Sequence, residues 1–158
     1  IQNLQTLPNL KALTFENCFF EDIQKLTTLN IQELALYNCR QNIDCVYTMN
    51  LQSLSVLNNT IDIQKLNTMQ NLKYLQISYC DVVENQKINL VNLQELYIDN
   101  TNINDLSFVK NITNLKKLSI TQEQCNQNLQ LVKDLIKNNI TVMQENMVNF
   151  KDLEGYYE

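Results

Sequence analysis

The chain has 158 residues, of which 44% are hydrophobic and 18% are charged, so it can form one domain with its own core. A single Gly and a single Pro exclude a glycine-rich phosphate loop, which needs several glycines. The formal net charge of −5 and the lone arginine, Arg40, argue against nucleic-acid binding, which relies on clustered Lys and Arg. No apolar run approaches the length of a membrane span, so no membrane contact is expected.

From residue 10 onward, one apolar phrase returns about every 21 residues. It has the form Leu-x-x-Leu-x-Leu-x-x-Cys or Asn. Its six copies are Leu10-Leu13-Phe15-Cys18, Ile31-Leu34-Leu36-Cys39, Leu51-Leu54-Val56-Asn59, Leu72-Leu75-Ile77-Cys80, Leu93-Leu96-Ile98-Thr101 and Leu115-Leu118-Ile120-Glu123. A repeat of this length indicates a stacked solenoid. Residues 1–9 match the back half of a repeat, so we expect a capping segment upstream of them.

Each copy of the phrase predicts a short strand. Alternation with period 2 puts two apolar side chains on the same side, and one such strand cannot bury them alone. We therefore expect six strands to stack into one parallel sheet. In the same alignment the outward positions form columns, of which the first is Ala12, Glu33, Ser53, Tyr74, Glu95 and Lys117.

The segments between the strands repeat as well. Asp22–Leu29 and Asp62–Met69 are near copies, with apolar residues at about every third position. That spacing favours 3-10 turns or short helices with one face turned inward. The predicted fold class is an α/β solenoid, with a short parallel sheet on one face and these turns on the other.

After residue 123 the pattern changes. Residues 128–137 have apolar spacing near 3.6 and predict an amphipathic helix, and residues 140–142 predict a last short strand. We interpret residues 124–142 as an end unit, so that the repeat domain covers residues 1–142. Residues 143–158 form an acidic tail, which either folds back over the last repeat or leads to a further segment or partner.

On these phrases the chain resembles the leucine-rich repeat family over roughly residues 1–123. The short repeat and its back half resemble the phosphatase-regulator and internalin types. The cysteines resemble the longer repeats of F-box ubiquitin-ligase adaptors. The resemblance implies an arc or horseshoe that has its parallel sheet on the concave face and binds protein there.

The last position of the phrase forms a turn column of Cys18, Cys39, Asn59, Cys80 and Thr101, which Glu123 breaks. In the family that the chain resembles, an inward Asn at this position bonds backbone groups that the turn leaves unpaired. A small thiol fits the same space. The alternative is metal or redox chemistry, but the chain has no His and no Cys-x-x-Cys, so no metal or cofactor is expected. Five cysteines, an odd number, favour free thiols in a reducing compartment; Cys45 and Cys125 lie outside the column, where either could be exposed.

The outward side of the strands predicts a recognition face. Its candidate partner-binding residues are Glu16, Glu33, Tyr37, Leu57, Tyr74, Tyr79, Glu95, Tyr97 and Asp99. Tyrosine buries a large area at low entropic cost, and the acids favour a partner with a basic surface. The alternative is that strands simply favour Tyr and that the acids keep the chain soluble.

The absence of His removes the commonest general base, so we predict that the chain is not an enzyme. The first hypothesis is an intracellular, cytoplasmic scaffold for a protein partner, within a longer chain or a multi-protein assembly. The alternatives are a secreted or cell-surface recognition or adhesion domain and an architectural subunit of a large assembly. Three glycosylation sequons, at Asn58, Asn111 and Asn139, are interpreted as accidents of an Asn-rich composition.

Overall fold

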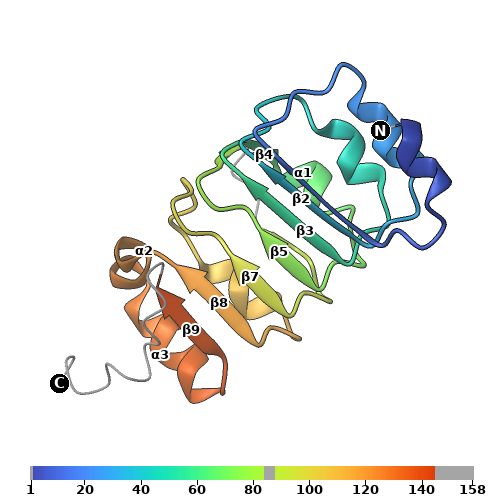
Figure 1. The fold of residues 1–158 in the computed structure, drawn as a ribbon. Coiled ribbons are helices and arrows are strands. Elements are labelled where there is room, and N and C mark those ends of the chain that lie inside the picture. The colour runs from blue at the N-terminus through green and yellow to red at the C-terminus, as the bar shows by residue number, and fades with distance from the viewer. Residues whose placement is uncertain (1, 84–87, 145–158) are drawn as a thin grey trace.

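The computed structural model describes residues 2–83 and 88–144, in which parallel strands stack into an arc (Figure 1). The main sheet has the strand order β1-β2-β3-β5-β7-β8-β9. Its strands are β1 (Ala12–Glu16), β2 (Glu33–Tyr37), β3 (Ser53–Leu57), β5 (Tyr74–Gln76), β7 (Glu95–Tyr97), β8 (Lys117–Ile120) and β9 (Thr141–Gln144). The first six are the strands that the repeated phrase predicts, and β9 is the expected last strand. The α/β solenoid is confirmed.

The register of the sheet follows the repeat. Ala12 pairs with Glu33, Glu33 with Ser53, and so on to Lys117, so the first outward column is confirmed. The inward leucines stack beneath it: Leu54, Leu75 and Leu96 are fully buried. Burying one such side chain stabilises the fold by about 1.5–3 kcal/mol. Each repeat forms one rung of the stack, and each rung therefore contributes to one continuous core.

Short helices return the chain from one strand to the next, as the apolar spacing predicts. They are η1 (Gln2–Thr6), η2 (Ile23–Thr28), η3 (Asp44–Thr48), α1 (Ile63–Leu66) and η4 (Ser107–Asn111). Each of the last four turns apolar side chains inward, with Leu26, Val46, Leu66 and Val109 almost fully buried. These side chains close the core against the sheet from the other side.

A second, two-stranded parallel sheet lies outside the main one. Strand β4 (Thr60–Asp62) pairs with β6 (Asp81–Val83), immediately after β3 and β5 in the chain. We call this pair the flank ribbon. The repeated phrase does not predict it, because only two of the rungs form it.

The C-terminal unit holds two helices, α2 (Gln122–Gln127) and α3 (Leu129–Lys137), before β9. Helix α3 confirms the amphipathic helix expected at 128–137, and it buries Leu131, Val132 and Leu135. Helix α2 was not expected, although Thr121 and Gln124 form a capping box that the sequence spells as T-x-x-Q. Residues 143 and 144 belong to β9, and the rest of the acidic tail lies outside the described residues.

Candidate partner-binding surfaces

The turn column lies inside the arc, where its side chains bond backbone carbonyls. The Cys39 and Cys80 thiols donate to Phe15 and Val56 of the preceding rungs, at 3.6 and 3.3 Å. Asn59 Nδ2 donates to the Cys39 carbonyl at 3.0 Å. Burial raises the pKa of the Cys80 thiol to about 11, which keeps it neutral and unreactive.

Other members of the column bond within their own rung. The half-buried Cys18 donates to the Glu16 carbonyl at 3.2 Å, and Thr101 Oγ1 donates to Ile98 at 2.9 Å. In the last rung, the side chain that bonds backbone carbonyls is that of Gln124 and not that of Glu123. Its Nε2 donates to the carbonyls of Ile98 and Ile103, at 3.2 and 2.9 Å. Cys45 and Cys125 are both buried, so neither thiol is exposed.

Seven of the nine predicted partner-binding residues lie on strands, at positions that alternate with the buried ones. Glu16 and Glu33 are exposed, and the other five are half-buried: Tyr37, Leu57, Tyr74, Glu95 and Tyr97. They come from β1, β2, β3, β5 and β7, so the arc brings together residues that are far apart in sequence. Tyr79 and Asp99 lie beyond the strand ends and have different surroundings.

Hydrogen bonds connect the polar groups of this face across neighbouring rungs. The Tyr37 hydroxyl donates to Ser55 Oγ at 3.4 Å, and Ser55 donates to Gln76 Oε1 at 2.6 Å. The Tyr74 hydroxyl donates to the same Gln76 oxygen at 3.2 Å. Three strands therefore share one polar network, which fixes the orientation of both tyrosines.

The network continues into an aromatic pair. The rings of Tyr74 and Tyr97 have centroids 5.1 Å apart, and Lys117 Nζ lies 5.1 Å from the Tyr97 centroid. The Tyr97 hydroxyl donates to Glu95 Oε2 at 2.9 Å. Burial raises the pKa of Tyr74 to about 12 and also raises that of Tyr97, so both phenols keep their protons. We call Tyr37, Tyr74, Glu95, Tyr97 and Lys117 the concave band.

Asp99 lies below this surface, with only 6% of its area exposed. Ser119 Oγ donates to its Oδ1 at 3.0 Å, and Ser78 Oγ lies 3.5 Å from its Oδ2. Burial raises the pKa of Asp99, and these hydrogen bonds partly offset the rise. The carboxylate joins its own rung to the rungs on either side, and little of it is exposed to a partner.

The backbone turns out of the strands through a left-handed residue in five rungs. These residues are Asn17, Asn38, Asn58, Tyr79 and Asn100, with φ between 52° and 58°. Asn tolerates this conformation, whereas a bulky residue does so at a cost. Tyr79 is the exception in the series, and its side chain is 54% exposed.

Three of these asparagines are hydrogen-bonded in a row along the edge of the arc where the strands end, which we call the rim. Asn38 Nδ2 donates to Asn17 Oδ1 at 3.2 Å, and Asn58 Nδ2 donates to Asn38 Oδ1 at 3.0 Å. The next rung has Tyr79, which carries no amide donor. Arg40 reaches across instead, and its Nη2 donates to Asn58 Oδ1 at 2.6 Å.

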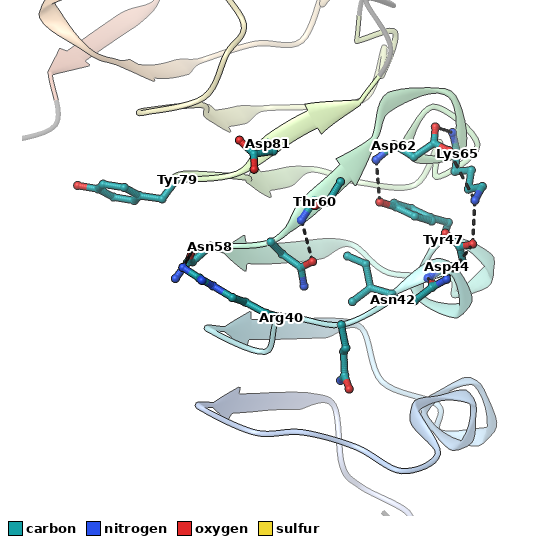
Figure 2. A pocket seen from close by; sticks show the side chains of 13 residues that line it. Arg40, Asn42, Asp44, Tyr47, Asn58, Thr60, Asp62, Lys65, Tyr79 and Asp81 are labelled. Atoms are coloured by element: carbon teal, nitrogen blue, oxygen red, sulfur yellow. Dashed lines mark hydrogen bonds and ion pairs between the residues drawn. The ribbon is translucent and has the colours of Figure 1, made fainter.

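A polar groove of about 680 Å³ opens beside this rim. Residues 40–44 form one wall, and the flank ribbon with Tyr79 forms the other. Figure 2 shows Arg40 and Asn58 at one end, with Tyr79 projecting outward, and Lys65 with Asp44 at the opposite end. We call this space the flank groove. Two features of the sequence coincide with this groove: Arg40 is the lone arginine, and Tyr79 stands in a left-handed series that otherwise holds Asn.

The charges of the flank groove are only partly paired. Lys65 Nζ lies 2.8 Å from Asp44 and 3.6 Å from Asp62. Within residues 2–83 and 88–144, Arg40 and Asp81 make no ion pair. Among the described residues, one positive and one negative group therefore remain without an ion-pair partner.

Neither a metal site nor a membrane helix occurs in the described part of the chain. No three His, Cys, Asp or Glu side chains gather closely enough there to hold a metal ion. No helix there has both the length and the apolar composition that crossing a bilayer requires. Residues 2–83 and 88–144 do offer polar surfaces, among them the concave band and the flank groove.

No protein-family model matches the sequence, and no curated protein matches it. Among solved structures, internalin C2 from Listeria monocytogenes is similar with a TM-score of 0.61 and 24% identity, over 77% of this chain and 56% of that one. An internalin (inlF) from the same organism is similar with a TM-score of 0.55 and 21% identity, over 77% of this chain and 44% of that one. The chain thus spans about half the length of these proteins. The likeness shows the fold, a leucine-rich repeat arc.

Proposed function

We propose that the chain is a non-catalytic scaffold that binds a protein partner through the concave band. Its arc presents an extended open sheet with half-buried tyrosines, a surface that suits a macromolecule better than a small substrate. The similar solved structures are internalins, and this likeness of fold is consistent with a recognition role.

The connected network of the concave band carries this proposal. Tyr37, Tyr74 and Tyr97 are each held by a hydrogen bond from the hydroxyl to a neighbouring side chain. Side chains that are already ordered lose little entropy on binding, so more of the contact energy appears as affinity. Tyrosines in such positions are frequent among the residues that dominate protein interfaces.

A basic surface on the partner is the second part of the proposal. Glu16 and Glu33 are exposed on the first two strands, and Glu95 lies beside Tyr97 in the concave band. With a chain charge of −5, these acids would steer a basic partner toward the sheet. Lys117, above Tyr97, marks the far end of this acidic region.

The test is affinity capture from native lysate, with the captured proteins identified by mass spectrometry. The Tyr37→Ala/Tyr74→Ala/Tyr97→Ala variant is expected to lose a partner that the unchanged chain holds, and Glu33→Lys/Glu95→Lys is expected to weaken it. Phe19→Ala, at an exposed aromatic outside the strands, is the matched control and should keep the partner. Retention of every captured protein by both concave variants would refute this surface as the binding site.

We also propose an intracellular, reducing location, since all five cysteines are free. The secreted alternative draws on the likeness to internalins. Mass analysis after denaturation and thiol alkylation without a reductant separates the two: because four of the thiols are buried in the folded chain, the alkylation needs the unfolded one, and five alkylated thiols are expected. A disulfide, or a glycan on the exposed Asn111, would favour the secreted alternative.

A further inference from the structure

The flank groove exists because one rung stays out of the flank ribbon. Strands β4 and β6 pair with each other, but residues 40–43 of the preceding rung form no strand beside β4. The gap between that segment and β4 is the groove, and its volume of about 680 Å³ lies within the range of specific ligand sites. The arc therefore carries a second concave surface, separate from the concave band.

Two backbone N–H groups of β4 are already hydrogen-bonded to side chains. The N–H of Thr60 donates to Asn59 Oδ1 at 2.7 Å, and the N–H of Asp62 donates to the Tyr47 hydroxyl at 3.1 Å. Tyr47 is buried, so its hydroxyl is not easily displaced. An occupant of the groove finds these two donors already used, so side chains of the groove become its main recognition groups.

Tyr79 is the first recognition element. It keeps a left-handed backbone where Asn17, Asn38, Asn58 and Asn100 fill the equivalent positions. The chain thus tolerates local strain to place an exposed aromatic ring at the end of the groove, as Figure 2 shows. Residues held in such a strained backbone conformation cluster at functional positions.

Arg40 and Asp81 are the second and third elements. The bond to Asn58 holds the Arg40 guanidinium in place and leaves its other N–H groups available for a carboxylate. Asp81 belongs to the flank ribbon on the other wall. The two walls thus offer opposite charges, neither neutralised by an ion pair among the described residues.

We propose that the flank groove binds an extended peptide segment of a partner protein, with an acidic side chain on Arg40, a basic side chain on Asp81 and a flat apolar contact on Tyr79. This site is additional to the concave band and does not depend on it. A segment of mixed charge matches both walls at once, whereas a uniformly acidic or basic segment would meet repulsion from one of them.

The experiment uses a display library of random octapeptides, selected on the full chain. Enriched peptides are expected to pair an acidic with a basic residue at a fixed spacing. Their affinity should fall at least tenfold for Arg40→Gln and for Tyr79→Asn. The second variant restores the residue type of the other rungs, so it should fold at least as well as the unchanged chain.

Two further variants make the outcome decisive. Leu129→Ala, at an exposed position on α3, should leave the affinity unchanged. Tyr97→Ala disrupts the concave band, so peptides lost by that variant would lie on the sheet and would overturn the proposal. Failure to enrich any peptide, or equal binding to Tyr79→Asn and the unchanged chain, would overturn it as well.

Discussion

At the scale of single residues, Tyr79 keeps an aromatic ring exposed at the cost of local stability. A left-handed conformation costs a residue with a side chain about 1–2 kcal/mol, and Asn bears it better than Tyr. We therefore expect Tyr79→Asn to raise the free energy of unfolding by about 0.5–1 kcal/mol. Urea denaturation measures this change. Asn58→Ala, which loses its bonds to Asn38 and Arg40, should lower the free energy of unfolding instead. A lower free energy of unfolding for Tyr79→Asn would show that contacts of the tyrosine ring outweigh the backbone strain.

Asp99 is the residue from which a pH dependence is expected. Burial raises its pKa, so the folded chain holds this proton more tightly than the unfolded chain does. Stability should therefore fall as pH rises from about 3.9, the ordinary pKa of Asp, through the higher folded value. Asp99→Asn should reduce this fall, measured by urea unfolding across a pH series. If Glu33→Gln, at an exposed carboxylate, reduced it equally, Asp99 would not be its source.

At the scale of elements, Gln124 joins α2 to the turn column. Its Nε2 satisfies two carbonyls of the preceding rung, and its Oε1 accepts from the Thr121 N–H at 2.9 Å. We expect Gln124→Ala to lower the free energy of unfolding by roughly 2–3 kcal/mol, because buried carbonyls and the capping box both lose a partner.

Gln127→Ala is the matched control for that substitution. Gln127 lies on the same helix but is exposed, so its loss should change stability by less than about 0.5 kcal/mol. Urea unfolding followed by circular dichroism compares the two. Equal effects would mean that the end unit contributes little to the stability of the arc.

At the scale of the whole molecule, the main contacts between strands of the described residues join neighbouring rungs. Strand β1 has a partner on one side only, and its Leu13 and Phe15 are half-buried, whereas Leu54 and Val56 of β3 are fully buried. Backbone amides of β1 should therefore exchange with deuterium faster than those of β3 under native conditions. Hydrogen-exchange mass spectrometry measures this gradient. Equal protection of both strands would indicate that the arc opens as one cooperative unit.

The sequence by itself determined the strands of the main sheet, their register and the short helical turns between most of them. A phrase that returns about every 21 residues allows one alignment, and a shift by one residue would turn Leu54 and Leu75 outward. Tyr37, Tyr74 and Tyr97 were placed on one face for the same reason.

Only the tertiary structure decided which polar groups meet across rungs and where the surface is hollow. Asp99 is buried and accepts hydrogen bonds from Ser78 and Ser119 of the neighbouring rungs. Gln124 replaces Glu123 because α2 begins where the strand phrase ends. The flank groove exists because residues 40–43 stay apart from β4. These outcomes depend on contacts between residues about 20 positions apart, and the alternation of apolar residues within one rung carries no information about them.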